Sequence, residues 1–396
     1  MVRVPRIRDR FLKPPPESLR KGPFRAGAFT SRLHEERTAS ILGIALGIAF
    51  TICFVTGLMS HLIQHPPSWF TWPSRPAGLY RVTQGLHVAT GIASIPLLLG
   101  KLWAVYPKLW EWPPIESVLH AVERLTLVPL VAGSLFLLFT GIANIGLWYP
   151  WRFFFPTGHY WAAWITIGAL IVHIGAKASI ASAALRKDPA DATPSDGTGL
   201  DRRGFLATIF GTAGVLTLTT AGQTFSPLAR FAVLAPRRQN VGVQGFPVNK
   251  SAASAGVERI ALDPSHRLTI SGNVARPLSL SLAELAALPQ HDAILPIACV
   301  EGWSAEARWT GVRVSDLLTM AGAQPGAAVT VGSLQERGLY RRSELNHLHA
   351  GDPDTLLALR INGEPLDIDH GYPVRLIGPN RPGVMQTKWV STLVVE

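Results

Sequence analysis

Four long apolar stretches dominate the first half of this 396-residue chain, at about residues 39–63, 80–105, 121–148 and 159–182. Each reaches the roughly 20 residues that a helix needs to cross the hydrocarbon core of a bilayer. Tryptophan and tyrosine gather at their ends, as in the interfacial belts of membrane proteins. A weaker stretch at about 205–228 is diluted by threonine and glycine. The pattern predicts a four-helix membrane bundle followed by a fifth transmembrane helix.

The composition requires a second, different part. Charged residues make up only 16% of the chain, against about 25% in an average soluble domain. However, 31 prolines and 36 glycines exclude helix throughout. The region after the fifth stretch shows short apolar runs with frequent turn residues, which predicts an α+β domain. Strands are expected at 267–270, 293–298, 329–331, 374–377 and 392–395, and helices at 282–288, with Ser281 as cap, and 314–321.

These observations divide the chain into four predicted segments. Residues 1–37 form a basic arm, and 38–185 form the four-helix membrane domain. Residues 186–235 hold a linker and the fifth helix, and 236–396 form the globular domain. The arm has no apolar core, so it does not read as a cleavable signal peptide.

Lysine and arginine lie mainly on one side of the predicted bundle. The arm alone carries ten, whereas the loops on the other side have little beyond Arg75, Arg81 and Arg152. Positive loops stay in the cytoplasm. We therefore expect a multi-pass protein of the cytoplasmic membrane, in contact with lipid, with a cytoplasmic N-terminus and an extracytoplasmic 236–396. The net charge of +11 is then largely a topology signal, and nucleic-acid binding is not expected.

Histidines inside the apolar stretches are the first functional candidates, because burying an ionisable group in a membrane costs free energy. His87 lies in the second stretch. His159 and His173 lie in the fourth, 14 residues apart, which places both on one helix face about 21 Å apart. That separation suits two b-type haems, since imidazole is a common axial ligand. The alternative is a set of interfacial polar residues.

His159 and His87 are the expected ligands of the outer haem, with His61 in reserve. His173 would bind the inner haem with a less certain partner, His34 or His120. Over residues 34–182 the sequence resembles the di-haem cytochrome b subunits of formate dehydrogenase and nickel hydrogenase, which place two histidines 14 apart on their fourth helix. The resemblance implies one or two haem b groups and a membrane quinone or quinol as electron partner.

The run Asp201-Arg202-Arg203-Gly204-Phe205-Leu206 precedes the fifth helix. It resembles a twin-arginine export motif, although Asp201 and Ala207 depart from the pattern. The resemblance implies export by the twin-arginine translocase of a domain that folds around its cofactor first. The alternative is an ordinary basic flank that anchors the helix end.

Cys299 is the centre of interest in 236–396. The only other cysteine, Cys53, lies in a predicted membrane helix, so Cys299 is expected to be a free thiol. A free thiol is unusual in an oxidising compartment, and a bound soft metal would protect it. The alternative is a buried structural cysteine.

The neighbours of Cys299 favour the metal. The loop Cys-Val-Glu-Gly-Trp-Ser at 299–304 is followed by Trp-Thr-Gly-Val at 309–312, Asn-Gly-Glu-Pro-Leu at 362–366, His-Gly-Tyr-Pro-Val-Arg-Leu at 370–376 and Lys-Trp at 388–389. Over about 255–396 this order and spacing resembles the sulfite oxidase family of molybdopterin enzymes, closest to its bacterial sulfoxide-reductase branch.

The resemblance implies a role for each matching residue. Cys299 would ligate molybdenum, and Glu301 would lie beside the metal as the second catalytic residue. The cofactor would be bound by Asn249, Trp303, Ser304, His370, Arg375 and Lys388. Of these, His370, Arg375 and Lys388 match positions that hold the pterin and its phosphate, and Asn249 matches one near the metal. No arginine directly precedes Cys299, which departs from the cationic setting of sulfite-oxidising members.

Together these features predict a membrane-bound molybdopterin-dependent oxidoreductase fused to its own cytochrome b. It would exchange electrons between a small substrate and membrane quinone, and the 299–304 loop favours reduction of a sulfoxide. Sulfite-type oxidation with the opposite electron flow is one alternative. A non-catalytic membrane receptor or anchor with an external domain is the other.

Overall fold

The computed structural model describes residue 17 and residues 22–25, 28–29, 31–111, 115, 118–186 and 201–396. Most of the predicted arm and residues 187–200 of the predicted linker lie outside this part. The chain forms two compact units. One contains residues 1–55 and 89–217, and the other contains 56–88 and 218–396.

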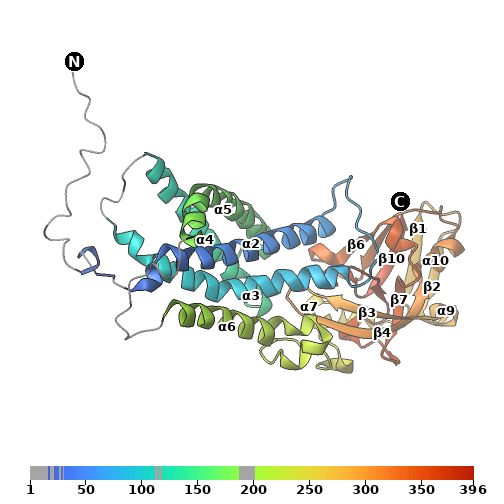
Figure 1. The fold of residues 1–396 in the computed structure, drawn as a ribbon. Helices are drawn as coiled ribbons and strands as arrows, with labels where there is room; N and C mark the ends of the chain where they lie inside the picture. Colours follow the sequence, from blue (N-terminus) through green and yellow to red (C-terminus); the bar gives the residue numbers. More distant parts are fainter. Residues whose placement is uncertain are drawn as a thin grey trace, which may run out of the picture. The chain divides into compact units, whose positions relative to one another are not determined.

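Five helices are long and apolar enough to cross a membrane (Figure 1). They are α2 (Glu36–Gln64), α3 (Leu79–Val105), α4 (Val118–Ile145), α5 (Phe155–Arg186) and α6 (Arg202–Ala221). Large apolar side chains cover their outer faces: Leu125 on α4 is 71% exposed and Ile171 on α5 is 65% exposed. All five predicted stretches are therefore helical, and their surfaces suit lipid.

Small residues allow α4 and α5 to approach closely. A Cβ atom added to Gly133 on α4 would collide with Oγ1 of Thr166 on α5. That hydroxyl donates to the carbonyl of Ala162 in its own helix, 2.7 Å away, so it is satisfied without a partner on α4. Close backbone approach at glycine is the usual packing device of membrane helices.

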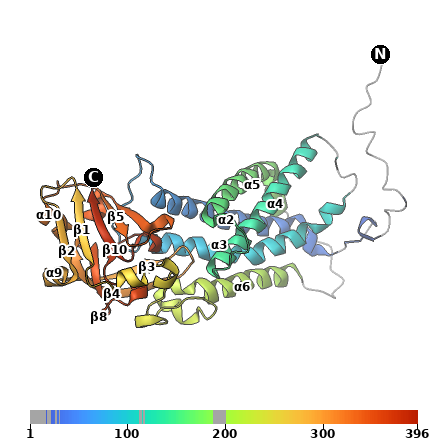
Figure 2. The ribbon, with the colours of Figure 1, turned by 180° about the vertical axis from the view of Figure 1, so that it is seen from behind.

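The first sheet of the globular domain has the strand order β2-β1-β10-β5-β6. Its strands are β1 (Arg267–Gly272), β2 (Leu278–Ser281), β5 (Val329–Ser333), β6 (Arg342–Leu345) and β10 (Val390–Val395). Strands β1 and β10 pair in parallel, and the other pairs are antiparallel. In both ribbon views β1 and β10 run side by side (Figures 1 and 2).

The second sheet has the order β3-β4-β7-β8, with β9 also paired to β7. Its strands are β3 (His291–Ala298), β4 (Ser304–Arg313), β7 (Leu356–Ile361), β8 (Glu364–Pro365) and β9 (Arg375–Ile377). Strands β3 and β4 form a hairpin in which Ala298 pairs with Ser304. The Cys299–Trp303 turn is therefore the tip of that hairpin.

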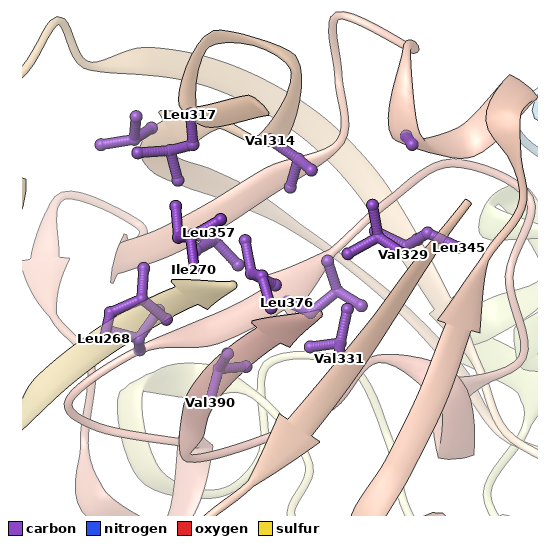
Figure 3. Close-up of a cluster of buried hydrophobic side chains, with 14 of the residues drawn as sticks. Leu268, Ile270, Val314, Leu317, Val329, Val331, Leu345, Leu357, Leu376 and Val390 are labelled. Carbon is purple, nitrogen blue, oxygen red and sulfur yellow. The ribbon is translucent and has the colours of Figure 1, made fainter. Parts of the chain in front are cut away.

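Short helices complete the domain: α7 (Ala252–Ala255), α8 (Glu258–Ala261), α9 (Leu282–Ala287), α10 (Val314–Ala321) and α11 (His347–Ala350). Ser281 caps α9 as predicted: its side chain accepts from the amide of Glu284, whose side chain returns to the Ser281 amide. A buried cluster joins the two sheets and helices α9, α10 and α11, with Leu268 and Val390 from the first sheet, Leu357 from the second and Leu317 from α10 (Figure 3). The predicted α+β character is confirmed.

Candidate functional site

Cys299 lies at the tip of the β3–β4 hairpin, completely buried. Its amide donates to the carbonyl of Trp303 at 2.9 Å, and the amide of Gly302 donates to the carbonyl of Cys299 at 3.0 Å. Gly302 has a φ of +85°, which explains the glycine at this tight turn. Neither cysteine forms a disulfide. Burial raises the pKa of Cys299 to about 12, so the thiol alone is protonated and only a bound cation would make it a thiolate.

Glu301, in the same turn, has two partners on one oxygen. The indole Nε1 of Trp303 donates to its Oε2 at 3.0 Å, and Nη1 of Arg237 lies 3.2 Å from the same atom. Burial raises the pKa of Glu301, while the charge of Arg237 opposes that rise. No arginine directly precedes Cys299 in the sequence, but Arg237, 62 residues upstream, places a cation beside Glu301. No motif in the sequence indicated this role of Arg237.

The segment 237–252, called here the strap, contributes several groups to this region. The amide nitrogen Nδ2 of Asn249 lies 3.8 Å from Sγ of Cys299, so Asn249 lies beside Cys299. The carbonyl of Val243 is 2.8 Å from Nε2 of His370. The carbonyl of Lys250 accepts from Nζ of Lys388 at 2.8 Å. The strap thus contacts both the predicted metal ligand, Cys299, and two of the predicted pterin-binding residues, His370 and Lys388.

Phe246 of the strap is the aromatic centre of the cluster and was also missed. Its ring lies edge-on to those of Trp303, Trp309 and His370, with centroid separations of 6.2, 5.5 and 5.7 Å. The guanidinium of Arg375 lies 5.1 Å from the Trp309 ring centroid. The structure therefore brings His370 and Arg375 into one cluster with the Cys299 turn, as the sequence predicts.

Arg375 and Lys388 are buried cations whose partners are neutral. Arg375 donates to the carbonyl of His370 at 3.0 Å, and Lys388 donates to the carbonyl of Asp369 at 2.7 Å. Neither joins an ion pair within the described part of the chain. Burial lowers the pKa of Arg375 to about 9 and that of Lys388 well below its ordinary value.

Several buried polar atoms of this cluster lack a hydrogen-bond partner in the described structure. They include Nδ1 of His370, Nε of Arg375 and Oγ of Ser304. Buried donors without partners are costly, and buried cations are stabilised by an anion. The residues present therefore fit a bound group that carries phosphate and polar ring atoms, such as a pterin cofactor. The four arginines at 308, 337, 341 and 342 are instead exposed.

The membrane histidines occupy the predicted helices. Nδ1 of His87 on α3 lies 3.3 Å from Oγ1 of Thr56, and Nδ1 of His159 on α5 lies 3.0 Å from Oγ1 of Thr140. A hydrogen bond at one ring nitrogen orients a histidine that ligates through the other. His173, also on α5, has a buried Nδ1 with no partner among the described residues.

The lower-ranked histidines lie elsewhere. Nδ1 of His34 is 3.2 Å from the carbonyl of Ala104, and the His61 ring lies tilted against that of His65, with 4.9 Å between the ring centroids. Across the described residues, no three His, Cys, Asp or Glu side chains gather as a metal site made by protein alone.

Comparison with known proteins identifies the globular domain. A family model described as the oxidoreductase molybdopterin-binding domain matches residues 254–396. YedZ1 of Azospira oryzae, provisionally assigned as a protein-methionine-sulfoxide reductase subunit, is 31% identical over 214 residues, which cover 49% of this chain and 80% of YedZ1. The uncharacterized oxidoreductase YuiH of Bacillus subtilis is 33% identical, with 39% of this chain and 75% of YuiH covered.

Mitochondrial sulfite oxidase of Rattus norvegicus is 31% identical over 163 residues, and the match covers 34% of this chain and 30% of that enzyme. The chain thus spans most of its bacterial relatives but under a third of this sulfite oxidase. The resemblance of residues 255–396 to the sulfite oxidase family is confirmed, and the non-catalytic receptor hypothesis is set aside. The chain belongs to the family of molybdopterin-binding oxidoreductases.

Proposed function

We propose that this chain is a membrane-bound enzyme that reduces a sulfoxide-type substrate with electrons drawn from membrane quinol through b-type haem. The observation that carries the proposal is the buried Cys299, with Asn249 at 3.8 Å and the Glu301–Arg237 pair in the same turn. The similarity to YedZ1 supports a sulfoxide as substrate. The balanced reaction consumes the sulfoxide, two electrons and two protons, and releases the sulfide and water.

The catalytic domain would hold its cofactor from two sides. The Cys299 thiolate would ligate molybdenum, and His370, Arg375 and Lys388 would bind the pterin and its phosphate. Molybdenum, when bound, supplies two-electron exchange of an oxygen atom. The partnerless Nδ1 of His370 and Nε of Arg375 support this assignment, because a polar anionic group would satisfy both.

Glu301 would supply protons to the oxygen that leaves the substrate. Its burial raises the pKa of its carboxyl group, which favours the protonated form that a general acid needs. Arg237 and Trp303 both hold Oε2, so the carboxyl group has a fixed orientation. Arg237 also limits the pKa rise, and the pair together sets the pH at which Glu301 gives up its proton.

The helices would carry haem b, which passes one electron at a time. His87 and His159 are proposed haem ligands, and each has a threonine hydroxyl next to one ring nitrogen. Gly57 supports this role for His87: a Cβ there would lie 3.0 Å from Cε1 of the imidazole, so a larger residue would displace the ring. His173 would bind a second haem, and His61, His34 and His120 remain reserve ligands.

A shallow apolar hollow next to His159 is the proposed quinol contact. It has a volume of about 350 Å³ and is lined by Phe136, Phe153, Phe154, Thr157, Gly158 and Trp161. Aromatic walls suit a quinone ring. Thr157 and Gly158 directly precede His159 in α5, so a quinol bound there would lie near the proposed haem ligand.

The membrane orientation is also a proposal, based on the positive loops. The predicted export motif can both cap the start of α6 and be recognised by the twin-arginine translocase. Oδ1 of Asp201 accepts from the amide of Gly204 at 2.7 Å and so caps α6. Asp201 thus serves the helix end whether or not the twin-arginine translocase reads the following residues.

The test uses the full chain purified in detergent. Metal analysis should find molybdenum, and visible spectra should show b-type haem. After reduction with a quinol analogue, methionine sulfoxide should reoxidise the haem. Cys299→Ala should abolish this reoxidation, whereas the matched Cys53→Ala should retain it. Haem reduced by sulfite, with no response to sulfoxides, would reverse the electron flow and establish sulfite-type oxidation instead.

A further inference from the structure

All the polar groups of Asn380 in the catalytic domain form hydrogen bonds with residues 72–80, which comprise part of the connection between α2 and α3 and the first residues of α3. Its amide donates to the carbonyl of Ala77 at 2.9 Å, and its carbonyl accepts from Nε1 of Trp72 at 2.9 Å. Its side chain donates to the carbonyl of Pro73 and accepts from the amide of Tyr80, both at 2.7 Å. Asn380 is only 3% exposed, so these bonds form away from water.

The loop that carries Asn380 also touches the Cys299 turn. Pro382 forms a parallel bridge with Ala298. A Cβ added to Gly383 would lie 3.5 Å from the Cα of Cys299, so the loop backbone packs directly on this residue. One side of residues 380–383 therefore faces Cys299, and the other holds the first turn of α3.

Apolar packing joins the same parts. Ala298, which precedes Cys299, shares a buried cluster with Ile63 near the end of α2, Trp72 in the connection and Tyr80 at the start of α3. Outside this cluster, Arg75 in the connection pairs with Asp352 at 2.8 Å and with Asp354 at 2.6 Å. The helix ends and the catalytic domain thus form one packed body, as their common compact unit indicates.

A chain of side-chain hydrogen bonds runs through this junction. The hydroxyl of Tyr340 donates to Oε1 of Gln64 at 2.7 Å, Nε2 of Gln64 donates to Oγ of Ser60 at 3.1 Å, and that Oγ is 3.0 Å from the hydroxyl of Tyr80. A carboxamide in the middle of the chain passes protons poorly, because it would have to change tautomer. The network therefore suits fixed geometry better than proton conduction.

Tyr80 connects this junction to the proposed haem ligand. Tyr80 and His87 are seven residues apart on α3, so they lie on one face about 10 Å apart along the helix axis. Gln84 lies on the same face between them, 3.4 Å from the Tyr80 hydroxyl. Electron tunnelling is faster through bonded and hydrogen-bonded atoms than across gaps, and this face offers such a route.

We propose that Asn380 and Tyr80 form the electron-transfer junction of the protein, through which electrons pass between His87 on α3 and the Cys299 turn. The junction stays closed during turnover, so the catalytic domain does not swing to collect electrons. This inference rests on the proposed function, because it needs a redox centre at each end. Both are positioning residues, because they act through the contacts that they make within the junction.

Two measurements on the full chain test the junction. In stopped flow, Tyr80→Leu and Asn380→Ala should slow reoxidation of pre-reduced haem by methionine sulfoxide several-fold. Sulfoxide reduction driven by reduced viologen, which delivers electrons to the molybdenum site directly, should keep its rate. Ser94→Ala is the matched control on α3, because its buried hydroxyl donates to the carbonyl of Thr90 in its own helix; it should change neither rate.

Hydrogen exchange gives the readout that does not depend on turnover. Asn380→Ala removes the acceptor of the Tyr80 amide, so exchange of this amide should speed up by about fivefold, the equivalent of one lost hydrogen bond of about 1 kcal/mol. Tyr80→Phe retains the aromatic ring and the hydrogen bond from the Tyr80 amide to Asn380. It replaces Tyr80→Leu as the test variant if the larger change disturbs folding, and it should slow haem reoxidation less than Tyr80→Leu does.

The outcomes separate the two ideas. Wild-type haem that ignores sulfoxide refutes the proposed function and the electron route with it, while the exchange measurement still tests whether Asn380 holds the Tyr80 amide. Unchanged haem reoxidation in both Tyr80→Leu and Asn380→Ala, in a responsive wild type, overturns the junction while the proposed function stands. Unchanged exchange of the Tyr80 amide in Asn380→Ala also overturns it.

Discussion

The helices expose apolar side chains, whereas the catalytic domain buries charged ones. Leu125 and Ile171 on the helices are mostly exposed, whereas Arg375, Arg381 and Lys388 in the catalytic domain are buried. Each pattern is unfavourable in water. Exposed leucine on long apolar helices calls for lipid, and buried cations without carboxylate partners call for an anion. In each region, the side chains whose exposure is unusual for a soluble protein therefore indicate the kind of partner that the region binds.

The largest expected effect is on the free energy of unfolding, and one leucine substitution in each region tests the contrast. Leu317→Ala empties a fully buried position in the catalytic core and should lower the free energy of unfolding by about 2–5 kcal/mol. Leu125→Ala changes a side chain that is 71% exposed and should change it by less than about 0.5 kcal/mol. Urea unfolding of the full chain in detergent measures both. Equal losses would show that Leu125 packs against protein, which would break the contrast.

The next prediction concerns the buried charge pair at the site. Arg237→Gln removes the cation beside Glu301, and the pKa of that carboxyl group should rise further because the opposing charge is lost. If Glu301 acts as an acid, its activity falls as the pH rises past its pKa, so the alkaline limb should move to higher pH. The pH–rate profile of viologen-driven sulfoxide reduction gives the shift. Arg237→Lys should keep the wild-type profile, and an unmoved limb in Arg237→Gln would remove Glu301 from the reaction.

A buried histidine away from the cofactor residues provides a pH test of stability. Burial and the nearby charge of Arg381 lower the pKa of His349 to about 3. Between pH 6.5 and 3 the unfolded chain binds a proton there and the folded chain does not, so stability falls as the pH falls through this range, by up to about 1.4 kcal/mol per pH unit. Above pH 6.5 the effect is absent. His349→Gln should flatten this part of the curve of unfolding free energy against pH, and an unchanged slope would contradict the assignment.

The smallest effect compares two hydroxyls at helix positions in the two regions. Ser281→Ala removes the cap of α9 and should cost about 1 kcal/mol of stability. Thr208→Ala on α6 removes a hydroxyl that bonds back to the carbonyl of Gly204 in its own helix, and it should cost almost nothing. Thermal unfolding of both variants ranks them, and a larger loss in Thr208→Ala would reverse the expected order.

The sequence predicts those features that depend on neighbours along the chain. Hydropathy located all five long helices, and the spacing of His159 and His173 placed both on α5. Short apolar runs between turn residues marked strands such as β1, in which Leu268 and Ile270 are buried. The order of motifs from Cys299 to Lys388 identified the family and hence most of the candidate cofactor site.

The remaining features arise from contacts between distant segments. Arg237 reaches Glu301 from before the matched domain, and Phe246 joins three rings that are far apart in the chain. Asn380 binds residues about 300 positions upstream. One asparagine in a loop carries no periodicity or motif that would indicate such a partner, so only the folded chain reveals it.

The strap has a consequence for how this enzyme is inherited and exchanged between proteins. The family match begins at residue 254, but residues 237–252 supply contacts to Cys299, Glu301, His370 and Lys388. A gene fusion cut at the family boundary would transfer both sheets and leave these contacts to the candidate site behind. The transferable module therefore starts before Arg237, and a fusion that keeps residues 237–252 with the two sheets also keeps these contacts.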